Sequence, residues 1–241
     1  TNEICKICKR EFERGKINVS SAGTLLSFME KPNFKMSFGF AQYCAEGNLC
    51  GDTIKTINDS RGHMVFIISD GMGKGSRAAL DGAMGAGLLS KLLSAGFGFD
   101  SSLKVVNSAL LVKSHEESLA TLDCVRVDLF SGKCEFYKAG APRSYIVKDD
   151  RLTKCELTSM PAGILRGVEF AKRTTVLNTD DEIIMMSDGV TDVGNEWLEK
   201  FLRLETTLEP NEKAKAILKI ALENSDEKHR DDMSVIVAKM I

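Results

Sequence analysis

Two short, wholly apolar runs, residues 64–68 and 183–186, limit most strongly how this chain can fold. Both have the length and character of strands buried inside a protein. Each run is followed directly by Ser-Asp-Gly, so Asp70 and Asp188 stand where a buried strand ends. For either tripeptide alone the simplest interpretation is a turn, because Asp and Gly are common turn residues. The repetition of the arrangement weakens that interpretation and favours a shared role for the two carboxylates.

Two further acidic positions follow the same pattern. Asp52 lies near the start of an expected strand, residues 51–57, which forms a hairpin with the run at 64–68, so Asp52 should lie close to Asp70. Asp231 stands just before the last apolar strand. Two carboxylates ~4 Å apart repel by about 4 kcal/mol at an effective dielectric constant near 20. A hard divalent cation relieves this repulsion, so the pattern indicates Mg²⁺ or Mn²⁺ rather than zinc.

The order of the expected elements is strands, two helices, many strands, two helices and one strand. Antiparallel strands with helices grouped outside favour two sheets packed face to face and covered by helices. Residues 1–33 are mixed and charged and are expected to form an N-terminal arm or helix where regulation could act, and 34–241 are expected to form one domain. The expected strands are 34–40, 51–57, 64–68, 121–128, 133–139, 145–147, 152–157, 170–177, 183–187 and 233–239, and the expected helices are 76–96, 101–113, 195–207 and 211–224.

The composition excludes several classes of protein. Of the 241 residues, 43% are hydrophobic and 27% are charged, which fits a folded globular chain rather than a disordered one. The formal net charge of −2 argues against nucleic-acid binding. Seven irregularly spaced cysteines argue against a disulfide framework and for a reducing compartment. No apolar run reaches the ~18–20 residues of a membrane span. We therefore expect a cytoplasmic domain, attached to a membrane only if segments outside this chain anchor it.

Five sequence blocks together resemble a known family. They occur in the order seen in the phosphatase domains of the stage II sporulation protein E family, within the protein phosphatase 2C superfamily. The resemblance covers about residues 45–241, and the ordered set is far more specific than any single Asp-Gly. The blocks are Gly51-Asp52-Thr53, Ile68-Ser69-Asp70-Gly71-Met72-Gly73-Lys74-Gly75, Thr121-Leu122-Asp123, Met186-Ser187-Asp188-Gly189-Val190 and Asp231-Asp232-Met233-Ser234-Val235.

The resemblance implies a fold and a metal site. The fold is an α+β protein, an α/β/β/α sandwich of two antiparallel sheets flanked by helices. The site holds two divalent cations, Mn²⁺ or Mg²⁺, with Asp52 and Asp70 expected to span both ions and Asp232 expected just behind the ligands. The implied metal-binding and catalytic residues are Asp52, Asp70, Asp188 and Asp231, and the backbone carbonyl of Gly71 is implied as a further metal ligand.

The resemblance also implies an activity. We expect a protein serine/threonine phosphatase that hydrolyses a phosphoserine or phosphothreonine monoester with metal-activated water. The implied substrate is a bacterial phosphoprotein of the anti-anti-sigma type, with a role in sporulation or stress control. A homodimer is left open. The competing hypothesis is a catalytically weak regulatory binding module of the same fold, which would be free to lose metal ligands that this sequence retains.

The sequence departs from eukaryotic relatives of the superfamily at three points. Gly51 stands where they place an acidic residue beside the metal-bridging Asp. No counterpart to their phosphate-binding Arg is found near the start of the domain, and His63 is expected to be structural rather than a general acid. The phosphate anchor and the proton donor are therefore unassigned.

Other phosphate-binding motifs fit poorly. A nucleotide-binding P-loop needs Ser or Thr directly after its Lys, and Gly75 occupies that position. A haloacid-dehalogenase phosphatase needs a second Asp two residues after the first, where this chain has Met72 and Val190.

Overall fold

The computed structural model describes residues 1–45, 47, 49–59, 61–73, 75–113, 119–149, 151–167, 169–227 and 230–241. Lys74 of the glycine-rich block lies outside these residues. None of the helices in this part of the chain combines the length and the apolar character that crossing a bilayer requires.

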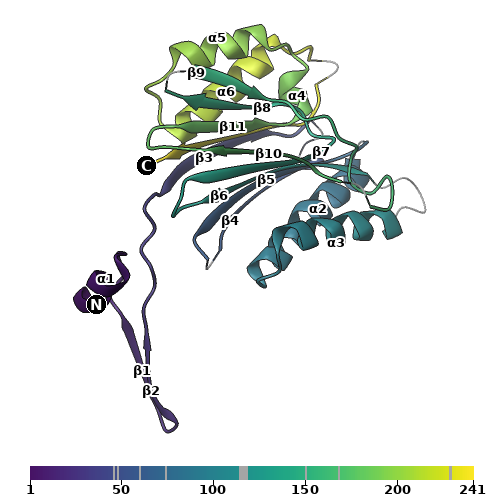
Figure 1. The fold of residues 1–241 in the computed structure, drawn as a ribbon. Helices are drawn as coiled ribbons and strands as arrows, with labels where there is room; N and C mark the ends of the chain where they lie inside the picture. Colours follow the sequence, from purple (N-terminus) through teal and green to yellow (C-terminus); the bar gives the residue numbers. More distant parts are fainter. Residues whose placement is uncertain are drawn as a thin grey trace.

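Two five-stranded antiparallel sheets stack face to face and form the centre of the molecule (Figure 1). The first sheet has the strand order β10-β7-β6-β5-β4, and the second has the order β3-β12-β11-β8-β9. The strands of the first sheet are β4 (Asp52–Asn58), β5 (His63–Gly71), β6 (Ala120–Asp128), β7 (Lys133–Ala139) and β10 (Ala171–Val176). Those of the second are β3 (Met36–Tyr43), β8 (Ser144–Lys148), β9 (Arg151–Cys155), β11 (Glu182–Met186) and β12 (Met233–Met240).

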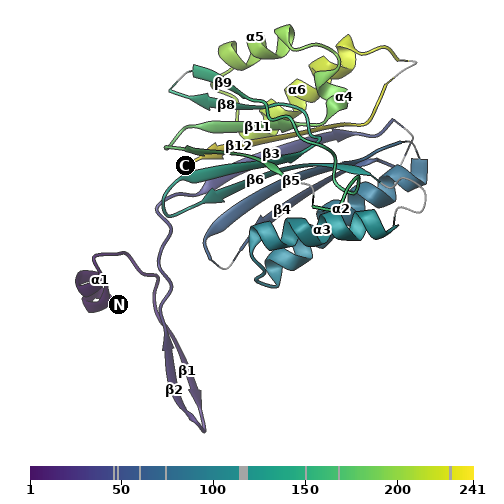
Figure 2. The same cartoon turned by 45° about the vertical axis from the view of Figure 1, so that its right-hand side comes forward.

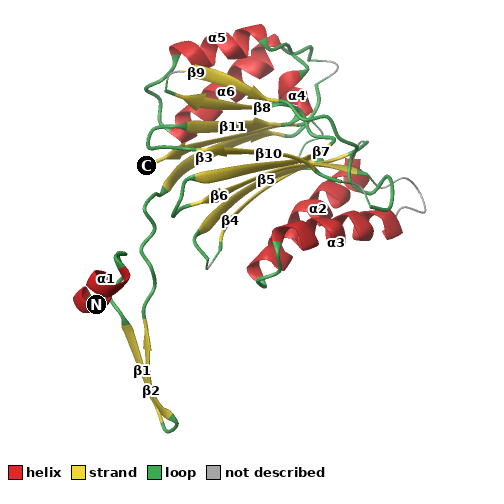
Figure 3. Ribbon diagram, in the orientation of Figure 1, coloured by secondary structure: helices red, strands yellow, loops and turns green. Residues whose placement is uncertain are grey.

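Helices cover the outer face of each sheet (Figure 3). The first sheet is covered by α2 (Gly75–Ser94), which packs on β4, β5 and β6, and by α3 (Phe99–Lys113), which packs on α2. The second sheet is covered by α4 (Asp188–Thr191), α5 (Glu196–Leu204) and α6 (Pro210–Asn224). This layer order confirms the expected α/β/β/α sandwich.

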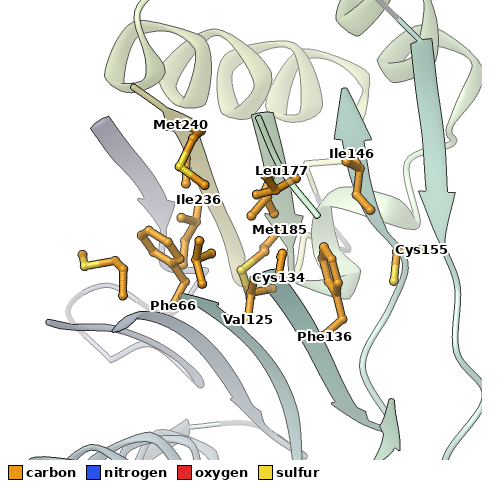
Figure 4. Close-up of a cluster of buried hydrophobic side chains, with 14 of the residues drawn as sticks. Phe66, Val125, Cys134, Phe136, Ile146, Cys155, Leu177, Met185, Ile236 and Met240 are labelled. Carbon is orange, nitrogen blue, oxygen red and sulfur yellow. The ribbon is translucent and has the colours of Figure 1, made fainter. Parts of the chain in front are cut away.

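The position of β5 in the sandwich explains why residues 64–68 are all apolar. Phe66 and Ile68 point between the two sheets, whereas Val65 and Ile67 point towards α2 and α3, so side chains on both faces are buried. Figure 4 shows the core between the sheets, where Phe66 lies near side chains contributed by both sheets. The labelled members of this core are Phe66, Val125, Cys134, Phe136, Ile146, Cys155, Leu177, Met185, Ile236 and Met240.

The first 33 residues contain structure that the sequence pattern did not specify. A short helix, α1 (Asn2–Cys8), is followed by a hairpin of β1 (Lys16–Ser20) and β2 (Gly23–Ser27). Figures 1 and 2 show this arm extending away from the sandwich. The hairpin was not predicted, because all but one of its strand residues are exposed and no core-facing alternation marks it.

Candidate metal centre

The β4–β5 hairpin places Asp52 and Asp70 directly opposite each other. The backbone N–H of Gly71 donates a hydrogen bond of 3.1 Å to the carbonyl of Gly51. Residues 51 and 71 therefore form a hydrogen-bonded pair, which leaves Asp52 and Asp70 as the adjacent narrow pair with Cα atoms about 4.5 Å apart. Facing residues of a sheet point to the same side, and this side faces the interior between the two sheets. The strand register thus places these two residues next to each other, as the hairpin predicted.

The second sheet brings Asp188 and Asp231 to the same end of the sandwich. Met186 of β11 pairs with Val235 of β12, and the N–H of Ser187 donates to the carbonyl of Ser234 over 3.0 Å. Asp188 begins the four-residue helix α4 rather than lying in a turn. Asp231 stands two residues before β12, on the chain that runs beside Ser187. The four predicted Asp residues are therefore gathered at one end of the sandwich.

Burial and mutual repulsion raise the pKa of three of these carboxyls. Burial raises the pKa of Asp52 to about 6, with further increases from Asp188 and Asp232. Burial, followed by the charges of Asp52, Asp188 and Asp231, raises the pKa of Asp70 to about 8. The pKa of Asp188 is also raised, chiefly by burial and then by Asp231. The folded protein therefore holds these carboxylates in surroundings that disfavour their charged form.

The carboxylate of Asp52 is the least satisfied polar group of the cluster. Its residue is 4% exposed, and neither oxygen has a hydrogen-bond partner. The hydroxyls of Ser187 and Ser234 lie close enough to lower its pKa, although they do not reach hydrogen-bond geometry. A buried carboxylate without a partner is costly, and two hard oxygen atoms suit a divalent cation. The donor set therefore fits Mn²⁺ or Mg²⁺.

The four Asp residues are grouped at one end of the sandwich, but their side chains do not form a preformed metal-binding cage. Within the described residues, no set of three or more His, Cys, Asp or Glu side chains is arranged so that it could hold a metal ion as it stands. Backbone carbonyls and water commonly complete the shell of such ions. The raised pKa values and the lack of partners at Asp52, rather than a preformed cage, mark the site.

Asp232 fixes the strand that carries Asp52. One carboxylate oxygen of Asp232 accepts a hydrogen bond of 2.7 Å from the N–H of Ala45, and the other accepts one of 2.5 Å from the N–H of Gly51. The amide of Gln42 adds a bridge, because its Nε2 donates to the carbonyl of Asp52 and to the hydroxyl of Ser234, each over 3.0 Å. Sequence reasoning did not find Gln42, since nothing in the pattern of β3 distinguishes it from a surface residue.

Glycine residues allow the helix α2 to pack closely against the site. A Cβ atom on Gly82 would overlap the carbonyl oxygen of Gly51, and one on Gly71 would overlap the carbonyl of Ala78. Glycine at these positions lets the helix backbone approach the ends of β4 and β5 closely. A cavity of about 170 Å³ opens beside this contact, and its lining includes Gly51, Gly73, Ala78, Arg230, Asp231 and Asp232.

The third of the five sequence blocks, Thr121-Leu122-Asp123, has a different structural role. The side chain of Asp123, on β6, is 2% exposed and forms an ion pair of 2.6 Å with Lys138 of β7, whose side chain is 0% exposed. The Lys138 ammonium also donates to the hydroxyl of Ser144 and to the carbonyl of Pro142. Ser144 belongs to the second sheet, so this pair joins the two sheets. The sequence pattern did not single out Lys138, because it lies in an otherwise ordinary strand.

Comparison with known proteins places the chain within a family and a fold. The family model of stage II sporulation protein E (SpoIIE) matches residues 60–241. The stage II sporulation protein E of Bacillus subtilis strain 168 is 28% identical over 222 residues, which cover 89% of this chain and 27% of that protein. The protein of the same name from Priestia megaterium is 31% identical over 200 residues, 80% of this chain and 34% of that protein. The chain thus spans about a quarter to a third of the length of these relatives.

Solved structures show the same fold. The structure of the PP2C phosphatase domain with a fragment of the regulatory domain of SpoIIE from Bacillus subtilis matches with a TM-score of 0.84 and 25% identity, covering 99% of this chain and 74% of that chain. The catalytic domain of the serine/threonine protein phosphatase PstP, in complex with two manganese ions, matches with a TM-score of 0.68 and 19% identity, covering 86% of this chain and 100% of that chain.

Proposed function

Because the chain belongs to the stage II sporulation protein E family, we propose that it is a metal-dependent protein serine/threonine phosphatase. One observation carries the proposal. The oxygens of Asp52 are buried without hydrogen-bond partners directly opposite Asp70, and no ion pair between described residues involves either carboxylate. A site that gathers repelling carboxylates without a protein cation is suited to divalent cations.

The proposed ligands come from both sheets. Asp52, Asp70, Asp188, Asp231 and the carbonyl of Gly71 would hold the cations. Two divalent cations, when bound, lower the pKa of water and neutralise the charge of a phosphomonoester. The residues of the chain hold this arrangement in place: Asp232 and Gln42 fix the strand that carries Asp52. The protein then needs no Ser or Cys nucleophile.

The proposed substrate is a phosphoserine or phosphothreonine in a regulatory protein of the anti-anti-sigma type. Family membership supports this choice, and the net charge of −2 argues against a nucleic-acid partner. Mn²⁺ is the proposed metal to test first, because the PstP structure, which shares the fold, contains two manganese ions.

The proposal is tested by hydrolysis of p-nitrophenyl phosphate in the presence of Mn²⁺. We expect activity that a chelator removes and that Asp70→Asn lowers by about three orders of magnitude, because metal ions supply several kcal/mol of transition-state stabilisation. Asp180→Asn is the matched control, since the side chain of Asp180 is 77% exposed and pairs with Lys239 at the opposite end of β12. This variant should keep the activity of the unaltered protein.

Two results would contradict the proposal. Hydrolysis that is indifferent to the chelator and to Asp70→Asn would exclude the metal mechanism. A folded protein that shows no hydrolysis with Mn²⁺ would favour the alternative of a regulatory binding module.

A further inference from the structure

Three large apolar side chains are exposed on one short segment of the loop between β9 and β10. Met160 is 53% exposed, Ile164 is 40% exposed and Leu165 is 54% exposed. Single exposed apolar residues are common on protein surfaces, but several gathered together mark an interaction site.

One side of the segment is held by a buried amide. Asn107 of α3 is 3% exposed. Its Nδ2 donates a hydrogen bond of 3.0 Å to the carbonyl of Leu165, and its Oδ1 accepts one of 2.9 Å from the N–H of Gly163. A buried Asn whose donor and acceptor both engage the backbone of one loop fixes the position of that loop.

The other side of the segment is joined to the first sheet. The backbones of Ala162 and Ala120 exchange two hydrogen bonds, of 2.9 and 3.2 Å. The hydroxyl of Ser159 donates to the carbonyl of Lys138 over 2.8 Å and accepts from the N–H of Gly140 over 3.2 Å. The apolar side chains are therefore exposed on a backbone that is held from two sides.

The segment lies beside the proposed metal centre. Ala120 faces Gly71 in the sheet and Ala162 faces Ala120, so Ala162 is two strand spacings, roughly 10 Å, from Gly71. In Figure 2 the loop runs from the end of β9 across the end of the sandwich towards α2 and α3. A polypeptide whose phosphoserine enters the metal centre must pass over the surrounding surface. Three residues of extended chain span roughly 10 Å, which matches the spacing between Gly71 and Ala162 of the segment.

We infer that residues 159–165 form a fixed docking platform for the polypeptide that carries the phosphoserine, with Ile164 and Leu165 contacting apolar side chains about three residues from it and Asn107 acting as the positioning residue. This inference rests on the proposed phosphatase function. The partner is a phosphoprotein surface that presents an apolar side chain near the phosphorylated residue. A small phosphate ester would not reach the platform.

The test compares two nine-residue peptides with phosphoserine at the centre, together with p-nitrophenyl phosphate. One peptide has Leu at the third position on each side of the phosphoserine, and the other has Ser there. The enzyme variants are Ile164→Ser combined with Leu165→Ser, and Asn107→Ala. The matched control is Leu204→Ser, because Leu204 is 68% exposed and lies on α5, outside the platform.

For the unaltered protein with Mn²⁺ we expect kcat/KM to be about tenfold higher for the Leu peptide than for the Ser peptide. The double variant should bring this ratio close to one while kcat/KM for p-nitrophenyl phosphate stays within about twofold. Asn107→Ala should lower the same ratio, which a general loss of folded protein would not change because both peptides would suffer equally. The Leu204→Ser control should keep the ratio.

The inference is overturned if the unaltered protein shows no preference for the Leu peptide, or if the double variant keeps that preference. Failure of the proposed function would look different, because the unaltered protein would then fail to hydrolyse p-nitrophenyl phosphate at all.

Discussion

Two carboxylate sites point into the space between the sheets, and the protein compensates only one of them. Asp123 has a buried ammonium 2.6 Å away, that of Lys138, and a hydroxyl from Ser144. Asp52 is buried to a similar degree, yet both its oxygens lack hydrogen-bond partners and its neighbour across the hairpin is another carboxylate, Asp70. The two sites differ in partners rather than in burial.

The difference indicates which site is structural and which is functional. At Asp123 the protein supplies its own countercharge: one carboxylate oxygen accepts from the Lys138 ammonium and from the Ser144 hydroxyl, the other has no partner, and the pair joins the two sheets. A cluster of carboxylates with raised pKa values is an open arrangement that a ligand must complete. The same fold thus contains a site neutralised by its own lysine and one that we propose is neutralised by cations.

The comparison between the two carboxylate sites can be tested at the Asp123–Lys138 ion pair. Lys138→Met leaves Asp123 buried without its partner, which should lower the free energy of unfolding by about 3–5 kcal/mol. Urea denaturation monitored by circular dichroism measures this change. Lys219→Met is the matched control, since the side chain of Lys219 is 77% exposed in a surface pair, and it should change stability by less than about 0.5 kcal/mol.

A second variant tests whether charge is the cause. Asp123→Leu combined with Lys138→Met removes both charges and should recover most of the stability lost in Lys138→Met. If the double variant is as unstable as the single one, the loss comes from packing and the comparison between the two carboxylate sites fails.

A substitution that disturbs the close packing of α2 against the metal centre should have a smaller effect on the free energy of unfolding. Gly82→Ala would force the helix away from the carbonyl of Gly51 and should lower the free energy of unfolding by about 1–3 kcal/mol. Gly87→Ala lies in the same helix with nothing within 4 Å of the added Cβ, so it should stabilise the protein by up to about 1 kcal/mol. Equal effects of the two variants in thermal unfolding would contradict the packing argument.

The smallest effect is expected from pH on the metal-free protein. The pKa of Asp70 is about 8 in the folded state, against about 3.9 for an ordinary Asp. Between these values the folded state keeps a proton that the unfolded state has lost, so stability should fall as pH rises from about 4 to about 8. We expect a loss on the order of 1–2 kcal/mol, since Asp70 is partly exposed to screening solvent. Urea midpoints for Asp70→Asn should show a shallower slope, and an unchanged slope would assign the effect to other groups.

Much of the fold was predictable because each element carries a local signal. The apolar run of β5, the small-residue face of α2 and Pro210 at the first turn of α6 all lie where the structure has the corresponding elements. The helix α4 was missed because four residues are too few for a periodic pattern. The hairpin of β1 and β2 was missed because it packs on no core.

The site was predictable only in part, for a related reason. Asp52 and Asp70 could be paired from the hairpin alone, because register follows from a short connection. The approach of Asp188 and Asp231 from the second sheet depends on how the sheets stack, which no local pattern encodes. The contacts of Gln42 and the pairing of Lys138 with Asp123 likewise appear only once distant strands are adjacent.

The most direct test of the central claim is the stability gained from Mn²⁺ in urea denaturation at pH 7.5. If the open carboxylate site binds the cation, Mn²⁺ at a hundred times its dissociation constant should raise the free energy of unfolding by about 2.7 kcal/mol, and Asp52→Asn should abolish most of that gain while Lys138→Met keeps it. No gain in the unaltered protein, or an equal gain in Asp52→Asn, would contradict the account.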